Sequence, residues 1–254
     1  MFKTKPVETR AEGLQRLLDV LGVKAEGWTL EKDAIILADG RRVPLLPWRT
    51  HYHNTAMLPF SRGASMKVGA AHGSSMNGPS AFRLLYAGCR SEGLKAMLKR
   101  ELDLSEFMLG AKTVHVFAMT NGDVLHVSTR LDNDTVCTLE LNATLPEGTD
   151  PVYKHELTTE DGFVTDRAVD TTVTPEPLYV INGEGVDFFA EVDTLTYGLS
   201  REDAVDVRAA YAILSGAADA DQYIADEKRL DKLCELVWKS AETCERLYAK
   251  EVDK

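Results

Sequence analysis

The sequence predicts an α+β fold, in which a large, mostly antiparallel sheet of about six strands is covered on one face by helices. Three observations lead to this prediction. Short β-prone segments follow one another between residues 112 and 181, turn residues separate them, and amphipathic helical patterns precede and follow the series. Short connections join antiparallel neighbours, and helices grouped against such a sheet form a layered α+β domain.

The strand series begins after Gly110, and each of its segments is bounded by turn residues. Several segments alternate apolar residues with Thr, His or charged residues, which predicts one face packed on helices and a second, more polar face. The six segments are residues 112–119, 123–131, 135–145, 152–159, 163–172 and 177–181, and turns are predicted at Asn121-Gly122, Asn133-Asp134, Glu147-Gly148 and Asp161-Gly162.

Helices are predicted on both sides of this series. Thr9 and Glu12 form a capping box before a leucine pattern that ends at Gly22. Further helices are expected at residues 94–109, 200–214 and 222–250. Asp39-Gly40 predicts a hairpin between residues 34–38 and 42–48. Residues 57–93 are rich in Gly, Ser, Met and Ala, and they are predicted to form loops with limited helix.

Composition limits the classes of partner. The chain has 254 residues and a formal net charge of −11, which argues against nucleic acid and anionic membranes as partners. No apolar run is long enough for a membrane span, and the first ten residues lack the apolar region of a signal peptide. Four widely spaced cysteines form no CxxC motif, so a reducing cytoplasm is expected, with Cys234 and Cys244 as small buried residues of a helix.

Two histidines stand two residues apart before the Gly- and Ser-rich region. On a strand, His51 and His53 would share a face, so both imidazoles could reach one metal ion or one substrate. No third metal ligand is evident. Asn54 and His72 could line a pocket beside them, and the alternative is a loop without chemistry.

Three stretches resemble the glucose–fructose oxidoreductase / inositol dehydrogenase family. Residues 237–248, VWKSAETCERLY, resemble the family's closing stretch, with Cys244 where the family usually has glycine. Lys5-Pro6 resembles the Lys-Pro of the family's Glu-Lys-Pro motif, with Thr4 in place of Glu. Residues 102–110, LDLSEFMLG, resemble the end of the helix that carries the family's catalytic Asp and His. The resemblance implies the family's C-terminal, substrate-side domain.

This resemblance divides the chain and implies a missing part. Residues 1–50 would be a remnant helix and hairpin that follow the Lys-Pro motif, and residues 51–254 the sheet domain. The family binds NAD(P) through a separate dinucleotide-binding domain with a G-x-G-x-x-G motif. Here the only closely paired glycines, Gly183 and Gly185, are followed by Phe188 where the third glycine would stand, and we interpret them as a turn. We therefore expect no cofactor in this chain.

The resemblance also bears on catalysis. The family's His falls on Arg100 and its first Asp on Ala96, whereas its second Asp is kept as Asp103. Arginine stays protonated and cannot serve as a general base. Lys5 is either a retained site lysine or a terminal residue without a role. Arg100 and Asp103 either bind an anionic substrate or form an exposed ion pair between positions i and i+3.

The sequence thus leads to three functional hypotheses. The first is a substrate-binding or accessory subunit, or a pseudoenzyme, acting on a sugar or polyol. The second is half of an oxidoreductase that needs a partner with a Rossmann domain. The third is a cofactor-independent lyase or hydrolase built around His51 and His53. The family resemblance further implies that the outer face of the sheet forms the interface of a homodimer or hetero-oligomer.

Overall fold

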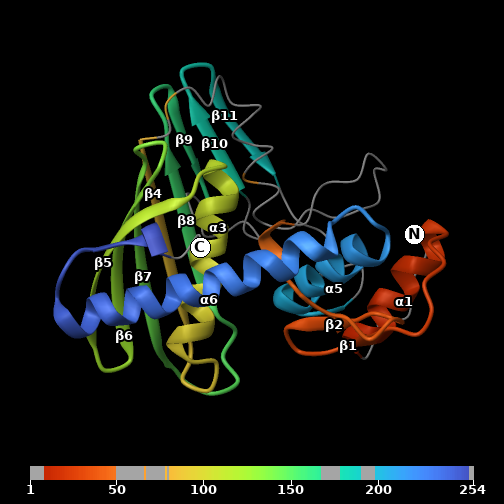
Figure 1. Cartoon of the computed structure of the whole chain (residues 1–254). Coiled ribbons are helices and arrows are strands. Elements are labelled where there is room, and N and C mark those ends of the chain that lie inside the picture. The colour runs from red at the N-terminus through yellow and green to blue at the C-terminus, as the bar shows by residue number, and fades with distance from the viewer. Residues whose placement is uncertain are drawn as a thin grey trace. The chain divides into compact units, whose positions relative to one another are not determined.

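The computed structural model describes residues 9–49, 66, 78, 80–166, 178–189 and 198–251, with the backbone alone at residues 187–189, 201, 202 and 251. It divides into two compact units (Figure 1). The first unit comprises Met1–Ser65 and Ala190–Glu227, and the second comprises Met66–Phe189 and Lys228–Lys254.

The first unit combines helices with a small sheet. The predicted capping box is present, because the Thr9 side chain accepts from the Glu12 backbone N–H and the Glu12 carboxylate accepts from that of Thr9. The predicted hairpin is also confirmed, with Gly40 at a φ of 84°. The elements are α1 (Arg10–Leu21), β1 (Thr29–Leu30), β2 (Ala34–Ile36), β3 (Arg42–Pro44), η1 (Pro47–Arg49), α5 (Arg201–Leu214) and the start of α6 (Ala220–Thr243).

The second unit is built on a nine-stranded sheet in the order β11-β10-β9-β8-β4-β7-β6-β5-β12. All six predicted segments contribute strands to it. The strands are β4 (Ala81–Cys89), β5 (Thr113–Asn121), β6 (Val124–Leu131), β7 (Val136–Leu145), β8 (Val152–Thr158), β9 (Gly162–Thr165), β10 (Leu178–Asn182), β11 (Gly185–Phe189) and β12 (Leu247–Tyr248).

The sheet is larger than the six strands predicted. It is mostly antiparallel, as predicted, but a parallel pair of strands makes it a mixed sheet. β4 lies in its middle, antiparallel to β8 and parallel to β7. The prediction of loops over residues 57–93 is therefore wrong for residues 81–89. Phe82, Leu84 and Tyr86 alternate on the buried side of β4, but their neighbours in the sheet come from segments far along the chain.

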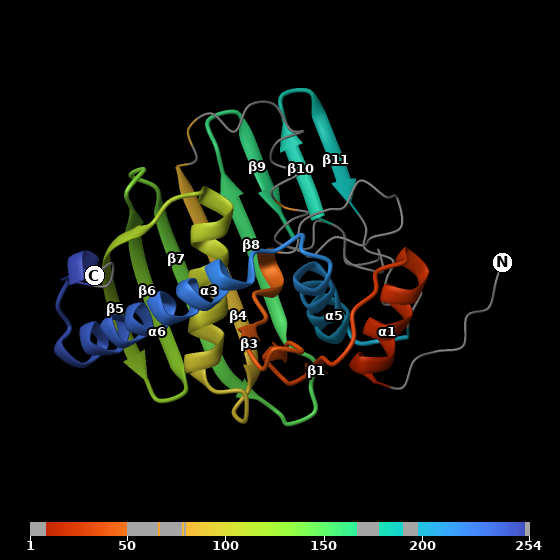
Figure 2. The ribbon, with the colours of Figure 1, turned by 45° about the vertical axis from the view of Figure 1, so that its right-hand side comes forward.

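Helices cover one face of this sheet. Figure 2 shows α3 (Leu94–Leu109) and the part of α6 after residue 227 on that face. α3 begins and ends near the predicted residues, and Gly110 caps it in the left-handed conformation at a φ of 58°. No helix of the described residues is long and apolar enough to cross a membrane.

The last helix is shorter than predicted. α6 ends at Thr243 instead of continuing to residue 250, because Cys244 adopts a left-handed φ of 54° and the chain turns into β12 and η2 (Ala249–Glu251). Cys244 is exposed, so the prediction that it is buried is wrong, whereas Cys234 is buried as expected. Burial raises the pKa of the Cys234 and Cys137 thiols to about 12, so both stay protonated.

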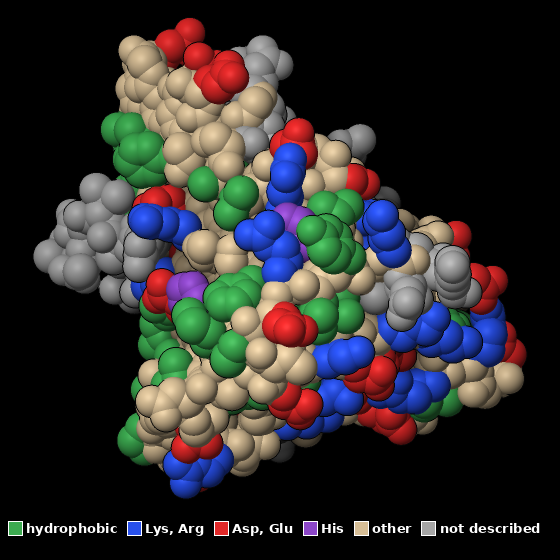
Figure 3. All heavy atoms as spheres, turned by 60° about the vertical axis from the view of Figure 1, so that its left-hand side comes forward, with side chains coloured by type: hydrophobic (Ala, Val, Ile, Leu, Met, Phe, Trp, Pro, Cys, Tyr) green, Lys and Arg blue, Asp and Glu red, His purple; other side chains and the backbone are tan. Residues whose placement is uncertain are grey.

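No helix of the described residues covers the opposite face of the sheet, which we call the open face (Figure 2). Its side chains are a mixture of charged, polar and hydrophobic groups, and Figure 3 shows hydrophobic, basic and histidine side chains close together on one side of the molecule. Large hydrophobic side chains that are 36–59% exposed lie on this face in six of the strands: Met119, Val124, Val136, Val152, Phe163 and Val186.

Candidate functional site

Arg100 lies on the side of α3 that faces the central strand of the sheet. Its Nη1 donates a hydrogen bond to the Tyr86 hydroxyl at 3.4 Å, and its guanidinium carbon lies 5.7 Å from the centre of the Tyr86 ring. The same Nη1 is 4.0 Å from a carboxylate oxygen of Glu92. The Tyr86 hydroxyl in turn donates a short hydrogen bond to Glu92. These contacts fix the direction of a cation whose side chain stays 22% exposed.

A second polar group is built around the residue that follows Arg100 in α3. Glu101, the next residue of α3, accepts from Nε2 of His155 on β8 at 3.1 Å. Nδ1 of His155 is 2.8 Å from Oδ2 of Asp166, the residue that follows β9. All three side chains are fully buried. The arrangement links a helix and two strands through one imidazole.

The charge state of His155 follows from its neighbours. Burial alone would lower the pKa of the imidazole, but the negative charges of Asp166 and Glu101 and their hydrogen bonds outweigh it and raise the pKa to about 9. His155 is therefore an imidazolium at neutral pH. No part of its side chain reaches solvent.

Aromatic rings enclose this imidazole. The ring centres of Tyr153 and Phe82 lie 6.1 and 6.4 Å from that of His155, and Tyr153 packs edge-on against Tyr86 at 5.6 Å. The apolar wall keeps water from the ion pairs, which strengthens them.

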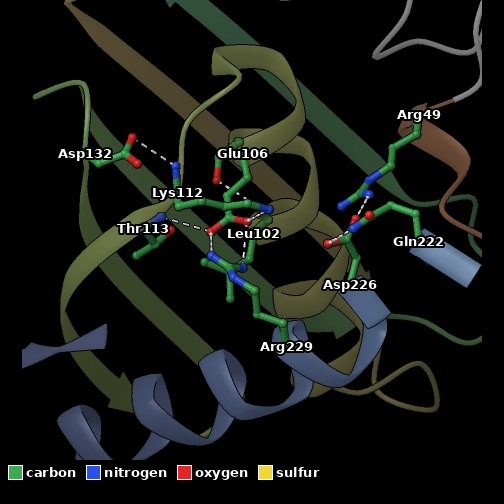
Figure 4. A network of polar contacts seen from close by, with 10 residues as sticks. Arg49, Leu102, Glu106, Lys112, Thr113, Asp132, Gln222, Asp226 and Arg229 are labelled. Carbon is green, nitrogen blue, oxygen red and sulfur yellow. Dashed lines mark hydrogen bonds and ion pairs between the residues drawn. The ribbon is translucent and has the colours of Figure 1, made fainter. Parts of the chain in front are cut away.

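The far end of α3 is fixed by a buried carboxylate (Figure 4). Arg229 of α6 donates to both oxygens of Glu106, at 2.7 and 2.8 Å. The backbone N–H of Thr113 donates to Glu106 at 3.0 Å, and Nζ of Lys112 lies 3.4 Å away. A bidentate pair of this kind sets orientation as well as energy. α3 is thus held at Glu101, near its middle, and at Glu106, in its last turn.

The structure places only some of the residues that the sequence analysis selected. Asp103 is 1% exposed, so the alternative of an exposed ion pair with Arg100 is wrong. The candidate residues Lys5, His51, His53, Asn54 and His72 lie outside the described residues, and their roles stay predictions. Within the part of the chain that the structure describes, no three His, Cys, Asp or Glu side chains are placed to hold a metal ion.

Sequence reasoning missed the residues around Arg100. Tyr86 and Glu92 belong to the region interpreted as loops. Glu101 follows Arg100 directly, and His155 stands at a buried position between Tyr153 and Leu157. A histidine on the apolar side of an alternating strand is therefore the signal that could have found the buried group.

The glycine pair Gly183 and Gly185 does not fit a dinucleotide. As predicted, it lies in the turn of a hairpin, between the antiparallel strands β10 and β11. The backbone N–H groups of Glu184 and Gly185 both donate to the side-chain oxygen of Asn182, at 2.8 and 3.2 Å. These amides are used inside the turn, and among the described residues the turn leads directly into strand β11 rather than into a helix N-terminus that could receive a pyrophosphate.

Solved structures of oxidoreductases share the fold of this chain. An oxidoreductase from Agrobacterium radiobacter, in complex with NAD+, L-tartaric acid and magnesium, matches 74% of this chain with a TM-score of 0.55 and 16% identity. Levoglucosan dehydrogenase in complex with NADH and L-sorbose matches 73% with a TM-score of 0.54 and 13% identity. UDP-N-acetylglucosamine 3-dehydrogenase from Acidithiobacillus ferrooxidans matches 70% with a TM-score of 0.50 and 15% identity.

The likeness is one of fold, and it confirms at that level the resemblance seen in the sequence. The matches cover 61%, 62% and 58% of the three proteins, so this chain spans less than two thirds of their length. No protein-family model and no curated protein matches the sequence.

Proposed function

We propose that this chain is a ligand-binding protein of the oxidoreductase fold, which binds a small polyhydroxylated acid beside α3 and does not oxidise it. The observation that carries the proposal is Arg100. The family resemblance implies that a catalytic histidine would stand at this position, and here a guanidinium takes its place, oriented by Tyr86 and Glu92.

The chemistry of the guanidinium favours binding over catalysis. Oxidation of a hydroxyl needs a group that can take up a proton, and arginine keeps its own proton throughout the accessible pH range. A guanidinium does bind carboxylates strongly, through paired N–H donors. Glu92 offsets part of its charge, and the Arg100 side chain is 22% exposed. Two proteins of the same fold were solved with L-tartaric acid or L-sorbose, which supports a hydroxyl-rich ligand.

Titration calorimetry with L-tartrate and L-sorbose tests this proposal. We expect L-tartrate to bind the wild type more tightly than neutral L-sorbose does. Arg100→Met should weaken tartrate binding by about 10- to 100-fold, because a charge-assisted hydrogen bond contributes roughly 1.5–3 kcal/mol. Arg83→Met is the matched control, since Arg83 is an exposed arginine on the open face. Equal tartrate affinity in Arg100→Met and wild type would contradict the proposal.

A second candidate raised by the sequence is an oxidoreductase half that needs a partner with a Rossmann domain. Proteins of the same fold that were solved with NAD+ or NADH favour it. Titration with tartrate in the presence of NAD+ and an isolated Rossmann domain separates the two candidates. An unchanged tartrate affinity favours the binding protein, whereas a higher affinity with NADH formation favours the oxidoreductase half.

We also propose that the open face of the sheet pairs with a second copy of this chain. Its exposed valines lie on four strands, Val124 on β6, Val136 on β7, Val152 on β8 and Val186 on β11, and such surfaces are usually covered. Val136→Lys should convert a dimer to a monomer in light scattering, whereas Val20→Lys, an exposed valine of α1, should not. A wild type that is monomeric at all concentrations would overturn this proposal, and so would a Val136→Lys variant that remains dimeric.

A further inference from the structure

A hollow of about 460 Å³ lies at the edge of the sheet, where β5, β6 and β12 meet; we call it the edge hollow. It lies within the second unit and is separate from the residues around Arg100. β12 pairs with β5 so that Tyr248 lies opposite His115, and His115 lies opposite Arg130 on β6. Three side chains from three strands therefore stand in one row across its floor. Its volume is in the range of pockets that hold small molecules.

Two rings form one part of the edge hollow. Those of His115 and Tyr248 meet edge to face with centres 5.9 Å apart, and Tyr248 is 58% exposed. Nδ1 of His115 is buried and has no hydrogen-bond partner among the described residues. An exposed aromatic face beside an unused nitrogen is suited to stacking with a flat ring.

Basic side chains form the other part. Two of them are paired, Lys112 with Glu106 and Arg130 with Asp134. Lys250 also lines the hollow, and in the described part of the chain it makes no ion pair. Asp132 is the remaining acid of the lining, and it accepts a hydrogen bond from the backbone of Lys112.

The electrostatic environment of His115 is consistent with an excess of positive charge. Burial lowers the pKa of this imidazole, and the positive charges of Arg246 and Arg130 lower it further. An anion placed here would meet Arg130 and Lys250, which line the hollow. In a chain with a net charge of −11, a basic hollow attracts small anions locally although the whole molecule repels them.

We propose that the edge hollow is a binding site for a small aromatic anion, with the ring against Tyr248 and His115 and the anionic group at Lys250 and Arg130. The site is distinct from the proposed acid site at Arg100. A carboxylate and a phosphate share the chemistry required, so both are used as probes. Their rings would occupy the same aromatic floor.

Titration calorimetry on the full chain with phenyl phosphate and with benzoate tests this inference. At least one probe should bind, and Lys250→Gln should weaken its binding by about tenfold, the effect of one charged hydrogen bond. Lys232→Gln, which removes an exposed lysine of α6 outside the hollow, should leave the affinity unchanged. Tyr248→Ala should weaken binding by roughly two- to tenfold through loss of the ring contact.

Three results would overturn the inference. One is that neither probe binds at millimolar concentration, and another is that Lys250→Gln and Lys232→Gln bind the probes equally. The third is that inorganic phosphate binds as tightly as phenyl phosphate, because the ring would then contribute nothing. Arg100→Met distinguishes the edge hollow from the proposed tartrate site at Arg100. This variant should not change the binding of phenyl phosphate or benzoate, even though it weakens the binding of tartrate.

Discussion

Arg229→Leu is expected to lower the free energy of unfolding by about 3 kcal/mol, the lower end of the range for breaking a buried ion pair from one side. The Glu106 side chain is only 2% exposed, and Arg229 is 14% exposed. Without Arg229, the carboxylate keeps the Thr113 backbone and Lys112 but loses its two shortest contacts. It would then be a buried and poorly compensated charge at the end of α3.

Urea unfolding of the variant measures this loss. Arg90→Leu is the matched control, because Arg90 forms an ion pair with Asp123 in the same unit but is 74% exposed. Exposed pairs contribute about 0–1 kcal/mol, so this variant should stay close to the wild type. Similar losses in the two variants would show that the Glu106 network does not hold α3 in place.

The second large effect concerns pH. The unfolding free energy is expected to fall as the pH rises from about 6.5 to about 9, because His155 has a pKa of about 9 in the folded chain and an ordinary value of 6.5. A raised pKa means that the folded chain binds the proton more tightly. The stabilisation from the protonated His155 is complete below pH 6.5 and is lost as the pH rises through the folded-state pKa of about 9. The loss is on the order of 3 kcal/mol.

Chemical unfolding at several pH values tests this expectation. In Glu101→Gln, one of the two carboxylates that raise the pKa is removed, so the decline should be smaller and should end at a lower pH. Glu140→Gln changes an exposed carboxylate on the open face, and it should follow the wild type. A wild type with constant stability between pH 6.5 and 9 would contradict the assignment of a protonated His155.

Local signals in the sequence predicted much of the fold. The capping box at Thr9, the stop at Gly110 and the turns between strands each depend on a few adjacent residues, and the structure contains all of them. β4 was missed because its pairing with β7 is parallel and distant in sequence, and because a Gly- and Ser-rich region precedes it. The end of α6 could have been predicted from the sequence. Cys244, which adopts a left-handed φ of 54°, stands where the oxidoreductase family that the chain resembles usually has glycine.

The candidate site was predictable only in part. Arg100 could be selected by resemblance to a motif. Glu101, Asp103 and Glu106 could not be identified as buried, because helical periodicity assigns charged residues to the exposed side. α3 buries these carboxylates, and Glu101 and Glu106 meet His155 and Arg229 from other elements. Such contacts depend on the assembled sheet and not on spacing along the chain.

The most direct test of ligand binding without oxidation is a single titration of L-tartrate into the full chain in the presence of NAD+, with nicotinamide absorbance recorded throughout. We predict saturable heat of tartrate binding, with an affinity about 10- to 100-fold lower in Arg100→Met, and no formation of NADH. NADH formation that saturates with tartrate would contradict the proposal, because it would require a proton acceptor and a bound dinucleotide that Arg100 and the Gly183–Gly185 turn do not provide.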